Sequence, residues 1–184
     1  MQLSFMFDIA SIIHTVGYFG LFAIVFAESG LFIGFFLPGD SLLFTAGFLA
    51  SQGYGNIAVI AGLCFVAAVA GDSFGYWFGK RTGPKIFTRE DSFFFRKSHI
   101  EKSKAYFEKH GKKTIILARF IPIVRTFAPI LAGVGEMDYK TFITYNIIGG
   151  FLWGVGVTVA GYFLGKAIPD VDKYLIPIII VIVI

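Results

Sequence analysis

Hydrophobic positions run in long, nearly unbroken segments along this chain of 184 residues. The segments over 55–79 and 139–165 are each longer than the ~20 residues that a helix needs to cross the ~30 Å hydrocarbon core of a bilayer. They predict two ordinary transmembrane helices. A shorter apolar run over 174–184 predicts a further C-terminal helix over 171–184, and the sequence leaves open whether the natural chain continues beyond Ile184.

Two further apolar segments contain residues that break helices. The first runs from residue 12 to residue 50 and the second from 115 to 135. Proline lacks an N–H and clashes with the preceding turn, so neither segment is expected to be one straight helix. Both segments predict re-entrant helical hairpins, which a membrane tolerates only where protein or a water-filled cavity covers the freed backbone. We expect the breaks at Pro38, Gly39, Pro122 and Pro129, with a helix resuming over 41–50.

The broken segments belong to an internal repeat. Gly75-Tyr76-Trp77-Phe78-Gly79-Lys80 recurs as Gly161-Tyr162-Phe163-Leu164-Gly165-Lys166 at an offset of 86, and the same offset relates Ala46-Gly47 to Ala132-Gly133. Chance similarity of glycine-rich apolar sequence is the alternative explanation. A hairpin plus one span crosses the membrane an odd number of times, so a second copy must enter from the opposite face. Secondary transporters commonly have this inverted-repeat architecture.

We therefore predict an all-α polytopic membrane protein, an inverted repeat of re-entrant hairpin plus transmembrane helix with a further C-terminal helix. The chain is expected to form a single membrane domain over 1–184. Repeat 1 covers about 15–80, a basic loop or helix covers 81–113, repeat 2 covers 114–166, and the C-terminal helix covers 171–184.

Composition and charge agree with a membrane location and suggest an orientation. Hydrophobic residues make up 56% of the chain and charged residues only 15%, against roughly 25% in soluble proteins. Eleven of the 16 Lys and Arg lie between Lys80 and Lys113. A short basic loop between apolar segments is typical of the cytoplasmic side, so the loop 80–113 is expected to be cytoplasmic and no nucleic-acid partner is needed to explain it.

Four ionisable residues lie inside the broken segments: Glu28 and Asp40 in the first, Arg119 and Arg125 in the second. A central charge costs about 2.5 to 3.5 kcal/mol on insertion scales, so these groups must meet each other, water or a charged ligand. Hairpins entering from opposite faces would bring the acids toward the arginines in one mixed-charge site. A simpler hypothesis is that the charges only form salt bridges that hold the hairpins together.

The chemistry of these groups favours a phosphate ligand. Guanidinium groups bind phosphate oxygens in pairs, and buried carboxylates can take up and release protons. Arg119 and Arg125 are therefore the candidate phosphate-binding residues, with Glu28 and Asp40 in coupling or gating. Asp72 could join the site or simply mark the polar end of its span.

Other kinds of site are not favoured. The three histidines lie outside both repeats, at positions 14, 99 and 110, Cys64 is the single cysteine, and no metal-ligand cluster or cofactor motif is present. A membrane enzyme acting on lipid phosphates would need a nucleophile or an acid/base histidine near the arginines, so we do not expect an enzyme.

Two stretches resemble the DedA family of bacterial membrane proteins, also called SNARE-associated or VTT-domain proteins. They are Phe26–Ser41 and the run from Ala118 through Thr126 to Gly133. The resemblance implies a lipid flippase that recycles polyprenyl phosphate, above all undecaprenyl phosphate, across the bacterial inner membrane with the proton motive force. The essential residues of the family fall on Glu28, Asp40, Arg119 and Arg125, and Thr126 is a further possible member of the site.

The implied partners are membrane lipids, protons or sodium ions, and a homo-oligomer is compatible with the sequence. Two other functions stay open. A proton-coupled exporter of small cations or drugs would depend on the acids more than on the arginines. A membrane assembly factor without transport would tolerate charge-neutral isosteres at all four positions.

Overall fold

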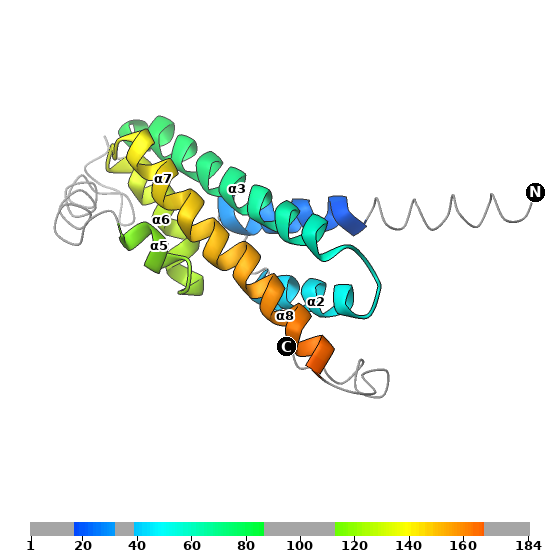
Figure 1. Cartoon of the computed structure of the whole chain (residues 1–184). Helices are drawn as coiled ribbons and strands as arrows, with labels where there is room; N and C mark the ends of the chain where they lie inside the picture. Colours follow the sequence, from blue (N-terminus) through cyan, green and yellow to red (C-terminus); the bar gives the residue numbers. More distant parts are fainter. Residues whose placement is uncertain (1–16, 32–38, 87–112, 168–184) are drawn as a thin grey trace, which may run out of the picture.

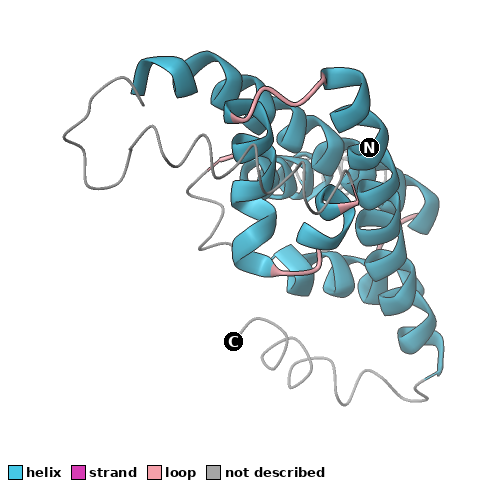
Figure 2. Cartoon of the chain, turned by 90° about the vertical axis from the view of Figure 1, so that its left-hand side faces the viewer, coloured by secondary structure: helices cyan, strands magenta, loops and turns pink. Residues whose placement is uncertain are grey.

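The computed structural model describes residues 17–31, 39–86 and 113–167. The described residues form helices joined by short turns, with no strand among them (Figure 2). The helices are Gly17–Gly30, α2 (Gly39–Ser51), α3 (Ile57–Ile86), α5 (Thr114–Ala118), α6 (Pro122–Val134), α7 (Tyr139–Gly150), a π-helical turn (Phe151–Val155) and α8 (Gly156–Ala167). We call the first of these the 17–30 helix.

Two of the described helices are long and apolar enough to cross a membrane. Ile57–Thr82 has a mean hydropathy of 2.1, and the continuous helix Tyr139–Ala167, made of α7, the π-helical turn and α8, has a mean hydropathy of 1.8. Both spans predicted from the sequence are confirmed as helices. They run side by side and form the frame of the molecule, to which the shorter helices are attached (Figure 1).

The shorter helices pack across the two halves of the chain, and glycines allow the close approach. Gly47 of α2 lies against Thr158 and Tyr162 of α8, where an added Cβ would be 3.1 Å from the Tyr162 nitrogen. Gly133 of α6 lies against Tyr76 and Lys80 of α3, where an added Cβ would be 2.8 Å from the Lys80 nitrogen. Gly47 and Gly133 are 86 positions apart, and so are Tyr76 and Tyr162, so each glycine lies near the corresponding tyrosine of the other half, with the contact on α3 one helical turn farther along.

A second pair of contacts has the same offset. Gly161 of α8 lies against the backbone of Phe44 in α2, and Gly75 of α3 lies against Ile130 in α6, where an added Cβ would be 3.5 Å from Cγ1. The second helix of each broken segment, α2 or α6, therefore packs on the span of the other half, while the 17–30 helix packs on α3 and α5 packs on α7.

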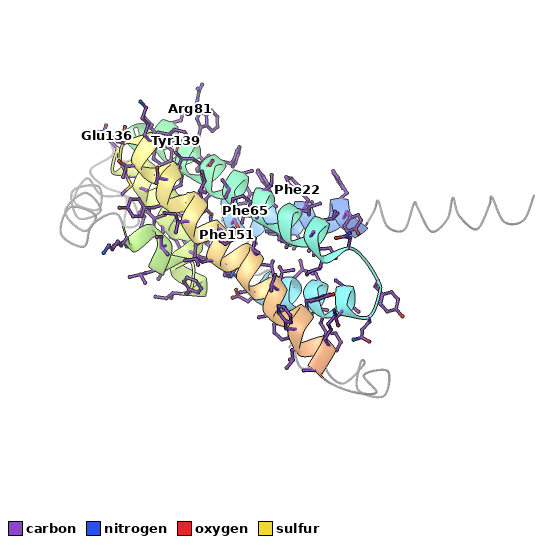
Figure 3. All side chains as sticks on the ribbon, in the orientation of Figure 1. Phe22, Phe65, Arg81, Glu136, Tyr139 and Phe151 are labelled. Carbon is purple, nitrogen blue, oxygen red and sulfur yellow. The ribbon has the colours of Figure 1, made fainter. Side chains whose placement is uncertain are left out.

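The outer surface is apolar along the length of the helices. Phe65 and Phe151 meet edge to face there, with ring centroids 6.2 Å apart, and Val66 is 54% exposed. Arg81, Glu136 and Tyr139 gather instead at one end of the bundle, where α3 ends and α7 begins (Figure 3). An apolar belt with polar residues at the end suits contact with lipid.

The expected helix breaks have different outcomes. α2 begins at Gly39 and α6 begins at Pro122, where the preceding Ile121 is extended with φ −117°. Pro129 requires a correction, because it lies inside α6 and does not break it. Its fixed φ is compatible with a helix, and within a membrane one missing N–H bond is tolerated where neighbouring groups compensate.

Other expectations lie wholly or partly outside the described residues. These are Pro38, residues 87–112 of the expected cytoplasmic loop, and the C-terminal helix over 171–184.

Candidate functional site

Arg125 is the centre of the first charged cluster. It lies in the first turn of α6, and its guanidinium forms ion pairs with Glu28 in the last turn of the 17–30 helix and with Asp40 in the first turn of α2. The Nη1 of Arg125 is 2.7 Å from the Asp40 carboxylate. Glu28 and Arg125 are buried, while the Asp40 side chain is 49% exposed. The broken segments of both halves thus meet at one guanidinium.

Trp153 completes this group from the π-helical turn. Its ring centroid is 4.8 Å from the guanidinium carbon of Arg125, and its indole N–H donates a hydrogen bond of 2.5 Å to Asp40. The indole therefore contacts the cation through its face and the carboxylate through its N–H. We call Glu28, Asp40, Arg125 and Trp153 the Arg125 cluster.

Gly39 is needed where α2 approaches Glu28. An added Cβ at this position would overlap the Glu28 carboxylate, so a larger residue would push the acid or the start of α2 away. Within the described part of the chain, Glu28 Oε2 and Arg125 Nε have no hydrogen-bond partner. The cluster is therefore closely packed but not fully hydrogen-bonded, which is rare for buried polar atoms.

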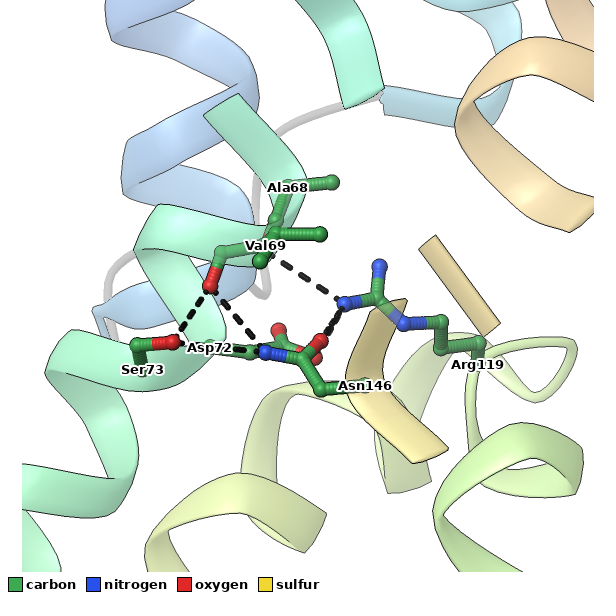
Figure 4. Close-up of polar contacts among 6 residues, drawn as sticks. All are labelled: Ala68, Val69, Asp72, Ser73, Arg119 and Asn146. Carbon is green, nitrogen blue, oxygen red and sulfur yellow. Dashed lines mark hydrogen bonds and ion pairs between the residues drawn. The ribbon is translucent and has the colours of Figure 1, made fainter. Parts of the chain in front are cut away.

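Arg119 lies in a second cluster, at the C-terminal end of α5 (Figure 4). Its Nη2 donates to the side chains of Asp72 in α3 and Asn146 in α7, and at 3.4 Å to the Ala68 carbonyl. Asn146 donates in turn to the Val69 carbonyl at 3.1 Å. The side chains of Arg119 and Asp72 are 4% and 5% exposed, so the pair is buried. We call Asp72, Arg119 and Asn146 the Arg119 cluster.

The four charges singled out in the sequence do not share one set of contacts. Glu28, Asp40 and Arg125 are brought together, whereas Arg119 is paired with Asp72. Thr126 is buried on α6, next in the chain to Arg125. Asp72, which the sequence placed either in the site or at the polar end of its span, has its side chain buried against Arg119.

Asn146 and Trp153 are site neighbours that the sequence analysis did not single out. One signal was available: both residues carry a side-chain N–H donor within the apolar span 139–167. Trp153 is also one of only two tryptophans in the chain. Their partners could not be read from the sequence, because neither belongs to the repeated motif.

One face of the second span joins the two clusters. Asn146 accepts a hydrogen bond from Arg119, and Gly149 and Gly150 leave room for the Arg119 side chain. Trp153 lies against Arg125. At a rise of 1.5 Å per residue, Asn146 and Trp153 are roughly 10 Å apart along the helix. The arginines therefore lie at neighbouring levels of the same helix face.

Comparison with known proteins identifies the family. The model of the VTT domain matches residues 37–163. The chain belongs to the DedA family. It is 50% identical to Protein DedA of Escherichia coli over 157 residues, which cover 84% of this chain and 71% of that protein. It is also 50% identical to an uncharacterized membrane protein of Mycobacterium leprae, over 85% of this chain and 70% of that protein.

A further uncharacterized membrane protein, from Mycobacterium tuberculosis, is 51% identical over 149 residues, which are 80% of this chain and 65% of that protein. No solved structure is significantly similar to the chain. The family resemblance seen in the sequence is confirmed, and this DedA-family chain is a membrane protein with the two apolar helices described above.

The chemistry available to this DedA-family protein is that of ion pairs. Among the described residues no group of three His, Cys, Asp or Glu side chains could hold a metal ion, and Cys64 is buried and free. The arrangement can bind an anion through guanidinium groups and can exchange protons at carboxylates.

Proposed function

We propose that this protein is a lipid flippase of the bacterial inner membrane that moves polyprenyl phosphate, with undecaprenyl phosphate as the favoured substrate, and that it is coupled to the proton motive force. The observation that carries the proposal is Arg125, a buried guanidinium held by two carboxylates in an apolar helical assembly. Guanidinium is the side-chain group best matched to phosphate.

The balance of charge in the Arg125 cluster supports coupling to protons. With both acids ionised, Glu28 and Asp40 carry one negative charge more than Arg125 neutralises. One proton on either acid balances the cluster, and a second leaves a positive charge for an anion. Protons and phosphate therefore favour each other's binding, which is the reciprocal coupling that a proton-driven carrier needs.

We propose Arg119 as the second phosphate-binding residue. In the structure its charge is balanced by Asp72, and its Nε has no hydrogen-bond partner among the described residues. When no phosphate is bound, Asp72 balances the charge of Arg119. The common helix face supports transfer of a head group between the arginines, because they lie at neighbouring levels of α7 and the π-helical turn.

Alternating access would follow from two re-entrant hairpins in an inverted repeat. The contacts of Gly47 near Tyr162 and of Gly133 near Tyr76 support this architecture, because each joins a broken segment to the span of the other half. In this arrangement the basic loop 80–113 is cytoplasmic, as the positive-inside rule predicts.

A second candidate, an exporter of small organic cations or drugs, is favoured by one specific observation. Two carboxylates and an indole face surround the Arg125 guanidinium, and the same groups would bind an organic cation if Arg125 moved away. This function needs Glu28 and Asp40 but not the arginines.

The test is translocation of fluorescent undecaprenyl phosphate in liposomes that contain the full chain. We expect Arg125→Ala, Arg119→Ala, Glu28→Gln and Asp40→Asn each to reduce translocation strongly. Arg81→Ala is the matched control, because Arg81 is an exposed arginine on α3. Translocation should rise as the loading side is acidified, and Glu28→Gln should reduce that response.

Unchanged lipid translocation in the folded arginine variants contradicts the proposal. If the same variants keep cation export while the acid variants lose it, the second candidate is correct. If all four neutral variants are fully functional in cells, the protein is an assembly factor without transport.

A further inference from the structure

A groove lies between the 17–30 helix and α2. Its volume is about 470 Å³. The walls are almost entirely apolar, and Ile60 of α3 is a further lining residue. The residues that carry the argument below are Gly20, Leu21, Ile24, Leu42, Ala46 and Leu49.

One end of this groove lies close to the Arg125 cluster. Ile24 is four residues before Glu28 on the same helix, and Leu42 is two residues after Asp40 on α2. Four residues of helix are about 6 Å, or one turn. Gly17 and Tyr54 line the groove farther from the acids, so the groove runs along the two helices toward the end where Glu28 and Asp40 lie.

We propose that this groove binds the apolar chain of polyprenyl phosphate, at the part of the chain next to the phosphate, while the phosphate meets Arg125. The inference rests on the proposed function and adds a place for the lipid tail. Charge complementarity supports it: the groove is mainly apolar and its lining comes within one helical turn of Glu28, an ion-pair partner of Arg125, as the ligand is apolar with an anion at one end.

A lipid chain suits this lining better than a peptide. A peptide would bring backbone N–H and C=O groups against apolar walls, and each unsatisfied group costs several kcal/mol in an apolar medium. A prenyl chain has no such groups. The volume of the groove lies in the range of about 300–1,000 Å³ that is typical of small-molecule sites.

The groove can be filled without disturbing the helices. A Cβ added at Gly20 meets no atom within 4 Å, so Gly20→Leu places a side chain in open space beside the groove. Gly62→Leu is the matched control, because Gly62 is also helical, also has nothing within 4 Å and does not line the groove. Ala46→Leu tests the opposite wall.

The experiment measures binding of radiolabelled undecaprenyl phosphate to the full chain in nanodiscs, beside dimethylallyl phosphate, which has the phosphate and only one prenyl unit. We expect Gly20→Leu and Ala46→Leu to weaken undecaprenyl phosphate binding by about tenfold, which corresponds to 1.4 kcal/mol. Dimethylallyl phosphate should bind these variants and the wild type equally. Gly62→Leu should bind both ligands as the wild type does.

Several results would overturn the proposal. If the two groove variants bind undecaprenyl phosphate as tightly as the wild type while Arg125→Ala loses it, the groove is wrong and the proposed function stands. If the wild type binds neither ligand, both proposals fail. A photoreactive residue at position 46 that crosslinks to residues 1–16, and not to lipid, would show that the chain's own segment occupies the groove.

Discussion

The two arginine clusters use the same residue type in different electrostatic settings. Arg125 has two carboxylate partners, one of them half exposed, while Arg119 has one carboxylate and one amide, both buried. The Arg125 cluster can change its net charge by taking up a proton through Asp40, whereas the Arg119 cluster is neutral and sealed. Along one helix face, the structure thus separates a partly exposed cluster with one acid in excess from a buried cluster whose charges balance.

Deleting the charge of Arg125 gives the largest expected effect. Arg125→Ala leaves Glu28 and Asp40 without their cation, and removing one partner of a buried ion pair costs about 3–5 kcal/mol. We expect a large fall in the midpoint of thermal unfolding in detergent, together with loss of lipid translocation. Adding Glu28→Gln should recover much of the stability and none of the transport.

An unchanged unfolding midpoint in Arg125→Ala would mean that the ion pairs do not stabilise the protein, and the comparison between the clusters would fail.

A double-mutant cycle on Arg119 and Asp72 tests the Arg119 cluster in the same comparison. The single variants Arg119→Met and Asp72→Leu each leave a buried charge unpaired, while the double variant leaves none. We expect the double variant to be more stable than either single one, with a coupling energy on the order of 3 kcal/mol. The measurement is equilibrium unfolding, followed by the translocation assay.

If the double variant is stable and still moves lipid at the wild-type rate, Arg119 is a structural residue and only Arg125 binds phosphate. If it is stable and inactive, both arginines belong to the transport site.

The glycine contacts test whether the halves that carry the clusters are equivalent. Gly47→Ala and Gly133→Ala both force a Cβ against the backbone of the opposite span, and overpacking of this kind costs about 1–3 kcal/mol. We expect the two variants to lower the unfolding midpoint by similar amounts. Gly62→Ala should instead stabilise the helix by up to about 1 kcal/mol, because its Cβ meets nothing within 4 Å. A large effect in one half alone contradicts the equivalence.

The smallest expected effect comes from Trp153→Phe. Phenylalanine keeps a ring over Arg125 but removes the indole N–H that bonds Asp40, and such a hydrogen bond contributes about 0.5–1.5 kcal/mol. Translocation should fall by up to about tenfold. Trp77→Phe is the control, because Trp77 also lies under an arginine but is 52% exposed on α3. Equal effects at both positions would remove Trp153 from the site.

Much of the helical organisation could be predicted from local sequence. The apolar runs over 55–79 and 139–165 correspond to the helices Ile57–Thr82 and Tyr139–Ala167, because a long apolar segment in a membrane satisfies its backbone groups as a helix. Helices begin at Gly39 and Pro122, where helix breakers were recognised. Pro129 was different because a proline inside a membrane helix can be compensated by its surroundings, which the local sequence does not show.

The sequence by itself determined that this is a helical membrane protein of the DedA family and that charges lie within its apolar segments, because hydropathy and motifs are properties of the chain alone. Only the tertiary structure decided which charges meet. The relative placement of α3, α5 and α7 brought Arg119 to Asp72 and Asn146, and the π-helical turn brought Trp153 to Arg125. The partners of a buried charge depend on the relative placement of helices distant in sequence, and no spacing within one segment records it.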